Sequence, residues 1–234
     1  FLLWETAADR GWIDSFFFSS PSRLGRLFLS MWRDGSLFLH VGITLTETLV
    51  SFALVVVIGL AVSLLLWLSD SVFQVLEPYL VILNSLPKSA LAPLLIVWLG
   101  ANSRTIIVAG MSVAIFGTIL NLYTGFTETS REKIRLIYTL HGTKKDALTK
   151  VVLPSTVPMI ISIMKVNIGL CLVGVVIGEF IGARNGLGYL IIYGSQVFQL
   201  DLVILSILIL CLMAMLLYGG VTAAEKLYHR RQHA

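Results

Sequence analysis

Residues Thr129–Pro158, TSREKIRLIYTLHGTKKDALTKVVLPSTVP, form the one long polar insert in a chain that otherwise consists of apolar stretches. Of the 234 residues, 57% are hydrophobic and 13% are charged, and the mean hydropathy is +0.90. Average soluble domains contain about 25% charged residues. The composition therefore indicates an integral membrane protein with a water-exposed insert on one side of the membrane.

Five apolar stretches account for most of the remaining chain. Each reaches the roughly 20 residues that a helix needs to cross a bilayer. None shows the alternating pattern of a membrane β-barrel. The predicted fold is therefore an all-α, polytopic membrane bundle. The five predicted spans run from Val41 to Leu68, Phe73 to Leu99, Thr105 to Phe126, Ser155 to Ile181, and Leu202 to Ala224.

The beginning of the sequence, FLLWETAADRGW, has no initiator Met and no basic leader followed by a cleavage site. It is therefore not a typical signal peptide. We interpret residues 1–40 as a partial N-terminal span followed by an extracytoplasmic connection. Residues 41–228 form the predicted membrane domain, and residues 229–234 form a cytoplasmic tail.

Basic residues are concentrated in two segments, the insert and the end of the chain. Because cytoplasmic loops of membrane proteins are enriched in Lys and Arg, both segments are predicted to be cytoplasmic. Residues 11–40 would then be extracytoplasmic although they carry three arginines, Arg23, Arg26 and Arg33, and a preceding span that begins inside would explain this. The basic residues that set the orientation are Arg131, Lys133, Arg135, Lys144, Lys145, Lys150, Lys226, Arg230 and Arg231.

The insert is predicted to form two short helices, and residues 128–153 contain both. Thr129 and Glu132 have the spacing of a capping box, as do Thr143 and Asp146. Gly142 lies between the two helices, where a helix C-terminus often needs a left-handed residue. The sequence therefore predicts a helix, a sharp turn and a second helix.

The first of these helices carries an apolar stripe at helical spacing. Such a stripe packs against a protein partner, against the core of its own chain, or against lipid headgroups. The periodicity does not distinguish these alternatives. The stripe residues are Ile134, Ile137, Tyr138 and His141.

The second predicted span contains Pro87 and Pro93. Pro87 removes a backbone donor and disturbs the carbonyl of Leu83. Freed carbonyls at membrane depth require a cavity or polar neighbours, and broken helices often mark transport sites. Polar side chains occur beside the proline, namely Asn84, Ser85 and Lys88. The alternative is that the prolines only shape packing and that Lys88 extends to the interface.

Several polar residues within the spans have two interpretations. Lys88 costs roughly 2.5 to 3.5 kcal/mol on insertion scales, and we interpret it as a source of positive potential for a passing anion. Glu179 is expected to pair with Arg184 or Lys88 rather than to contact substrate. Glu47 and Glu77 are expected near span ends. The remaining polar residues, which either bond between helices or line a pathway, are Thr118, Asn121 and Asn167.

The sequence lacks the motifs of several catalytic classes. No G-x-x-x-x-G-K-[ST] phosphate loop is present, so ATP hydrolysis is not assigned to this chain. The histidines show no metal-ligand spacing. Cys171 and Cys211 lie in apolar stretches and are interpreted as packing residues. We therefore expect neither an enzyme nor a metal site.

The end of the insert, Val151-Val152-Leu153-Pro154, resembles the EAA loop of binding-protein-dependent ABC importer permeases. That pattern is E-A-A, three residues, Gly, nine residues, and I-x-L-P. Counting back from Leu153 and Pro154 places its Gly at His141 and its E-A-A at 135–137, where this chain has Arg-Leu-Ile. The resemblance implies ATPase coupling by Ile134, Arg135, Ile137, Tyr138, His141, Gly142, Thr143, Leu153 and Pro154.

Further segments resemble the nitrate, sulfonate and taurine permease subfamily. Residues 86–94, LPKSALAPL, followed by Trp98-Leu99-Gly100, are similar to its P-x-x-A-L-x-P-L and W-[FL]-G elements. Gly178-Glu179-Phe180 and residues 186–190, GLGYL, are similar to two later elements. Together these segments extend over residues 41–229.

The resemblance implies a type I, methionine-permease-like transmembrane domain with five complete spans. Expected partners are a second permease copy, two ATPase subunits that carry ATP and Mg, and an extracytoplasmic binding protein in a bacterial inner membrane. This chain itself would bind no cofactor. The expected substrate is a small anion such as an alkanesulfonate, taurine or nitrate. The alternatives are a vitamin precursor of the pyrimidine or riboflavin type, or an ATPase-independent transporter or channel. The implied pathway residues are Asn84, Ser85, Pro87, Lys88, Thr118, Asn121, Asn167 and Glu179.

Overall fold

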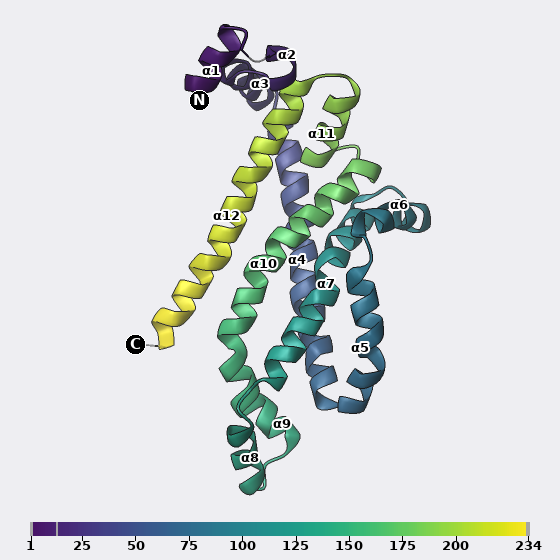
Figure 1. The fold of residues 1–234 in the computed structure, drawn as a ribbon, viewed down its shortest axis with the longest axis vertical. Coiled ribbons are helices and arrows are strands. Elements are labelled where there is room, and N and C mark those ends of the chain that lie inside the picture. Colours follow the sequence, from purple (N-terminus) through teal and green to yellow (C-terminus); the bar gives the residue numbers. More distant parts are fainter. Residues whose placement is uncertain (1, 13, 233–234) are drawn as a thin grey trace.

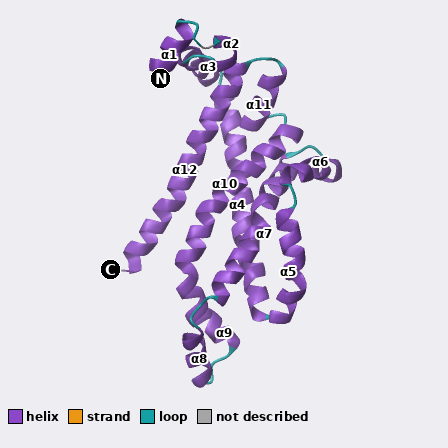
Figure 2. Ribbon diagram, viewed as in Figure 1, coloured by secondary structure: helices purple, strands orange, loops and turns teal. Residues whose placement is uncertain are grey.

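The structure, a computed structural model, describes residues 2–12 and 14–232, which form helices and loops without strands (Figures 1 and 2). This confirms the all-α prediction. The elements are α1 (Leu2–Asp9), α2 (Ser15–Phe18), α3 (Pro21–Arg33), α4 (Ser36–Leu68), α5 (Asp70–Ser85), α6 (Lys88–Leu99), α7 (Ser103–Thr127), α8 (Arg131–Thr139), α9 (Lys144–Ala147), the π-helical turn η1 (Leu148–Val152), α10 (Leu153–Gly182), α11 (Leu187–Gln196) and α12 (Leu200–Gln232).

Within the described residues, four helical segments are long and apolar enough to cross a membrane by themselves: α4, α7, the continuous helix 144–182, and residues 200–226 of α12. The second predicted span is different, because α5 and α6 meet at an angle of 96°. Phe73–Leu99 is therefore a bent pair rather than one straight helix. The bend falls at Leu86 and Pro87, where the missing proline N–H interrupts the helical hydrogen bonds.

The long helices form an elongated bundle (Figure 1). α8 and α9 lie at one end, which we call the α8–α9 end, and α1–α3 and α11 lie at the other, which we call the α11 end. At the α11 end, Arg23 of α3 donates to Asp201 of α12 through Nε at 3.0 Å and Nη2 at 2.7 Å. The partial span predicted in residues 1–40 stays a prediction, and Phe1 lies outside the described residues.

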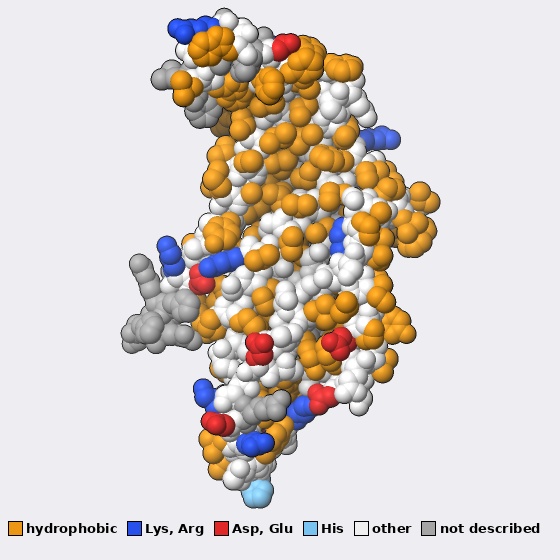
Figure 3. All heavy atoms as spheres, viewed as in Figure 1, with side chains coloured by type: hydrophobic (Ala, Val, Ile, Leu, Met, Phe, Trp, Pro, Cys, Tyr) orange, Lys and Arg blue, Asp and Glu red, His pale blue; other side chains and the backbone are white. Residues whose placement is uncertain are grey.

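Side-chain types are distributed unevenly over the surface (Figure 3). Apolar side chains cover the middle of the visible face, whereas charged side chains gather toward the α8–α9 end. Many exposed side chains on the long helices are large and apolar, such as Val57 of α4 and Leu216 of α12. Such a surface is expected where lipid or another protein chain covers it.

α7 occupies the centre of the bundle and packs on both α4 and α10. Ser51 and Ser63 of α4 each donate a hydrogen bond to a backbone carbonyl of α7, at 3.0 and 3.1 Å. On the other side, Gly174 of α10 faces Gly110 of α7 so closely that a Cβ at Gly174 would lie 2.8 Å from the Gly110 Cα. Small residues permit such backbone contact in membranes, where helices gain little from apolar burial against each other.

This contact predicts an asymmetry between two glycines of α10. Gly174→Ala should lower the free energy of unfolding by about 1–3 kcal/mol, because the added methyl group overlaps α7. Gly169→Ala is the matched control, since a Cβ at Gly169 meets no atom within 4 Å. Thermal unfolding in detergent measures both. Equal transition temperatures for the two variants would contradict the close packing of α7 on α10.

Candidate functional site

The break between α5 and α6 is stabilised by the ammonium group of Lys88. Its Nζ donates to the carbonyl oxygens of Leu83 and of Asn84, the latter at 3.1 Å. It also lies 5.3 Å from the centre of the Phe116 ring of α7. The carbonyl that Pro87 was predicted to disturb thus receives its hydrogen bond from a side chain. Lys88 is held over the end of α5 rather than extended freely to the interface.

A cavity of about 330 Å³ lies next to this break, between α5, α7 and α10. Within its wall, the Asn167 amide Nδ2 donates to the Thr118 hydroxyl at 2.8 Å, and both residues are buried. Both interpretations of Thr118 and Asn167 therefore apply, because the two side chains form a hydrogen bond between α7 and α10 and also line the cavity. The polar residues that line it are Asn84, Thr118, Asn121, Ser162 and Asn167.

The eight predicted pathway residues fall into three groups. Asn84, Thr118, Asn121 and Asn167 come together in the cavity. Ser85, Pro87 and Lys88 lie at the adjoining break without lining it, and the Ser85 hydroxyl donates to the Val81 carbonyl at 2.8 Å. Glu179 lies elsewhere, at the α11 end. The cavity wall is therefore rich in neutral hydrogen-bonding groups, with one positive charge nearby.

Glu179 is buried, and its carboxylate accepts hydrogen bonds from the Thr44 hydroxyl at 2.7 Å and from the Gly188 N–H at 2.6 Å. The predicted pairing with Arg184 or Lys88 is wrong. The correct partners come from α4 and from the first turn of α11, which α10 approaches only in the folded bundle. Glu179 therefore joins three elements and has no contact with the cavity.

A second acid, Glu47, was predicted near a span end. It lies in α4 beside the start of α7 and the end of α10, where Ser103 and Gly182 line the same pocket, and only 3% of its surface is exposed. The sequence did not predict this burial, because an isolated acid in an apolar stretch gives no sign of which helix face it occupies. The face turns toward α7 and α10, so that Glu47 lies near Ser103 and Glu179. Glu77 of α5 is exposed.

The insert forms the predicted helix, turn and helix, with one capping box rather than two. Thr143 Oγ1 accepts from the Asp146 N–H at 3.2 Å, and Asp146 Oδ2 accepts from the Thr143 N–H at 2.9 Å, which confirms the second box. The prediction of a first capping box, between Thr129 and Glu132, is wrong. α8 begins after Ser130, and the buried Thr129 hydroxyl has no hydrogen-bond partner among the described residues.

The left-handed residue of the turn is His141, with φ 59°, and not Gly142 as predicted. Gly142 contributes its N–H, which donates to the Ile137 carbonyl at 2.9 Å and closes the end of α8. His141 is also the position at which the EAA pattern has Gly. The residue differs from the pattern, but its backbone adopts the conformation that glycine favours.

The apolar stripe of α8 is shared between interior and surface. Ile134 and Ile137 pack against a buried cluster of Trp67, Leu122, Phe126, Ala147, Leu148, Val152 and Met164, joined by Leu153. Two stripe residues therefore pack against the core of their own chain, which was one of the three alternatives that the sequence left open. The apolar side chains exposed on and after α8 are Leu136, Tyr138 and Leu140, at 59, 45 and 70%. Arg135 is exposed as well, and Pro154 lies in the first turn of α10.

Comparison with known proteins finds relatives that are named as transport permeases. A probable ABC transporter permease of Haemophilus influenzae is 30% identical over 98% of this chain and 91% of the relative. The formylaminopyrimidine transport permease of Halalkalibacterium halodurans is 29% identical, covering 81% and 76%. The taurine transport permease of Escherichia coli is 24% identical, covering 96% and 83%.

The fold also resembles a solved structure. The inward-facing MetNI methionine ABC transporter has a chain that superposes with a TM-score of 0.70 at 20% identity, covering 79% of this chain and 92% of that one. The family described as "Binding-protein-dependent transport system inner membrane component" matches residues 55–232. The chain therefore belongs to this family, as a multi-pass, non-catalytic permease of an ABC importer in which a partner ATPase hydrolyses ATP.

Proposed function

We propose that this permease moves a small polar solute by alternating access through the cavity between α5, α7 and α10. One observation carries the proposal. α7 and α10 both line the cavity, and they are also the two helices between which α8 and α9 are inserted. A force applied to α8 and α9 therefore reaches two walls of the cavity through continuous helices. The family's ATPase partners would supply that force at the cytoplasmic α8–α9 end.

The docking surface that we propose is the exposed side of residues 128–153. Leu136, Tyr138 and Leu140 present apolar contacts there, and Arg135 adds a charge. Ile134 and Ile137 have a different role, because their contacts with the buried cluster fix α8 to the bundle. A displaced α8 would consequently carry the ends of α7 and α10 with it.

A second copy of the chain is proposed to cover α5. Every residue of this helix is at least partly exposed, including Val75, Tyr79 and Ile82 at 64, 62 and 61%. Asn84 lies on the same helix and lines the cavity. Two copies that meet through α5 would enclose a shared pathway. The binding protein would then deliver substrate at the α11 end.

For the substrate we propose a small anion such as an alkanesulfonate, taurine or nitrate, because the Lys88 ammonium lies at the break beside Asn84. A neutral vitamin precursor is the second candidate. It is favoured by the uncharged lining of the cavity and by relatives named as formylaminopyrimidine and riboflavin transport permeases. The two candidates differ in their dependence on the charge of residue 88.

The charge dependence gives a direct test in proteoliposomes that contain the complete importer. Lys88→Met should reduce uptake of the anionic substrate about tenfold or more, because a charged hydrogen-bonding group is lost. Lys88→Arg should retain most of it, and Lys226→Met, at an exposed position of α12, is the control. Unchanged anion uptake by Lys88→Met would remove Lys88 from the pathway.

Gly142→Pro tests coupling. The substitution removes the N–H that closes α8 on the Ile137 carbonyl, and it restricts the backbone of His141. Transport-linked ATPase activity should be lost while the protein stays in the membrane. His141→Gly is the matched control, because it keeps the turn and relieves the left-handed strain. ATPase stimulation by substrate-loaded binding protein is the measurement, and normal stimulation in Gly142→Pro would argue against coupling through this turn.

A further inference from the structure

Glu47 is a buried acid that the transport proposal does not use. Its carboxyl group lies between α4, α7 and α10, and in the described part of the chain neither oxygen has a hydrogen-bond donor at bonding distance. Its polar neighbours are the Ser103 hydroxyl and the Glu179 carboxyl group. An ionised carboxylate without donors is strongly unfavourable at this depth. The environment therefore favours a neutral Glu47.

Glu179 is as deeply buried as Glu47, but its carboxyl group has hydrogen-bond donors. Its two oxygens accept hydrogen bonds from the Thr44 hydroxyl and the Gly188 N–H, which stabilise the charged form. Two adjacent buried carboxyl groups share a proton more readily than they both ionise. We propose that Glu47 and Glu179 form a site for one proton, which resides on Glu47 and is donated in a hydrogen bond to the Glu179 carboxylate.

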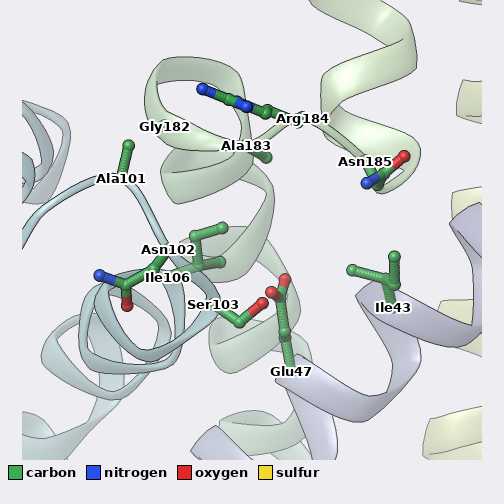
Figure 4. A pocket seen from close by; sticks show the side chains of 10 residues that line it. All are labelled: Ile43, Glu47, Ala101, Asn102, Ser103, Ile106, Gly182, Ala183, Arg184 and Asn185. Carbon is green, nitrogen blue, oxygen red and sulfur yellow. The ribbon is translucent and has the colours of Figure 1, made fainter.

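A pocket connects Glu47 to the surface at the α11 end. Its volume is about 170 Å³, and Glu47 forms part of its wall (Figure 4). The other side of the pocket is formed by Asn102, in the turn between α6 and α7, by Ser103 at the start of α7, and by Asn185 in the connection between α10 and α11. Hydroxyl and amide groups of this kind can hold the water that transfers a proton. The pair therefore exchanges its proton with solvent at the α11 end.

The other charged and titratable groups around Glu47 do not offer its carboxylate a positive charge or a hydrogen bond in place of the proton. Arg184 lines the same pocket, but its guanidinium group points away from Glu47 in Figure 4. His40 of α4 accepts a hydrogen bond at Nδ1 from the Gly186 N–H, so that nitrogen is occupied. α7 contributes the uncharged Ser103, and α10 contributes Glu179. Loss of the proton would leave two negative charges between α4 and α10, so a bound proton favours their packed arrangement.

Infrared spectroscopy of the permease in lipid nanodiscs tests the site without any transport assay. At neutral pH the wild-type protein should show the C=O band of a protonated carboxyl group, shifted in D2O. Glu47→Gln should remove this band, whereas Glu77→Gln, at an exposed acid of α5, should retain it. A wild-type protein without the band, or its persistence in Glu47→Gln, would overturn the proposal.

Two further measurements sharpen the test. Glu47→Gln should fold with an unchanged thermal transition, because the amide can donate to Glu179 as the protonated acid does. A variant that fails to fold would contradict a neutral Glu47. Ala101→Trp, which fills the pocket from its wall, should slow exchange of the band in D2O at least severalfold. An unchanged rate would overturn the pocket as the route of the proton.

Discussion

The close contact between the backbones of α7 and α10 holds the other parts of this structure in place. Gly110 and Gly174 allow the two helices to touch, and Gly178 continues the contact against Ile106. Because lipid is as apolar as the helix surfaces, this close fit and a few hydrogen bonds must hold the pair together. The two helices carry α8 and α9 at one end, the amide-lined cavity near their middle, and Glu47 and Glu179 at the other end.

At the break between α5 and α6, one polar side chain meets a structural need and, as we propose, a functional one. A membrane helix cannot leave carbonyls unpaired, and Pro87 leaves that of Leu83 without its usual donor. Lys88 supplies the hydrogen bond and brings a positive charge beside the cavity. Its charge is accommodated by carbonyl oxygens and the Phe116 ring. A carboxylate in their place would cancel the attraction for the anion that we propose as substrate.

Much of the fold could be predicted from the sequence, because span length, proline positions and capping residues are local signals. The bend at Pro87, the box at Thr143 and the helical insert are of this kind. The partners of Glu179, the burial of Glu47 and the inward face of Ile134 and Ile137 could not be predicted. They depend on which helices become neighbours, and spans that are apolar on all sides do not encode this in their periodicity. The sequence predicted part of the cavity lining, through the Asn and Thr residues that lie among the apolar residues of α7 and α10.

We propose that ATPase action at α8 and α9 changes the side of the membrane from which the cavity is reached. The most direct measurement is thiol labelling of Val166→Cys, a cavity position, in the complete importer with Cys171→Ala and Cys211→Ser. Impermeant reagents should modify it from the cytoplasmic side without nucleotide and from the opposite side when the ATPases hold a non-hydrolysable ATP analogue. Labelling from the same side in both states would contradict the account.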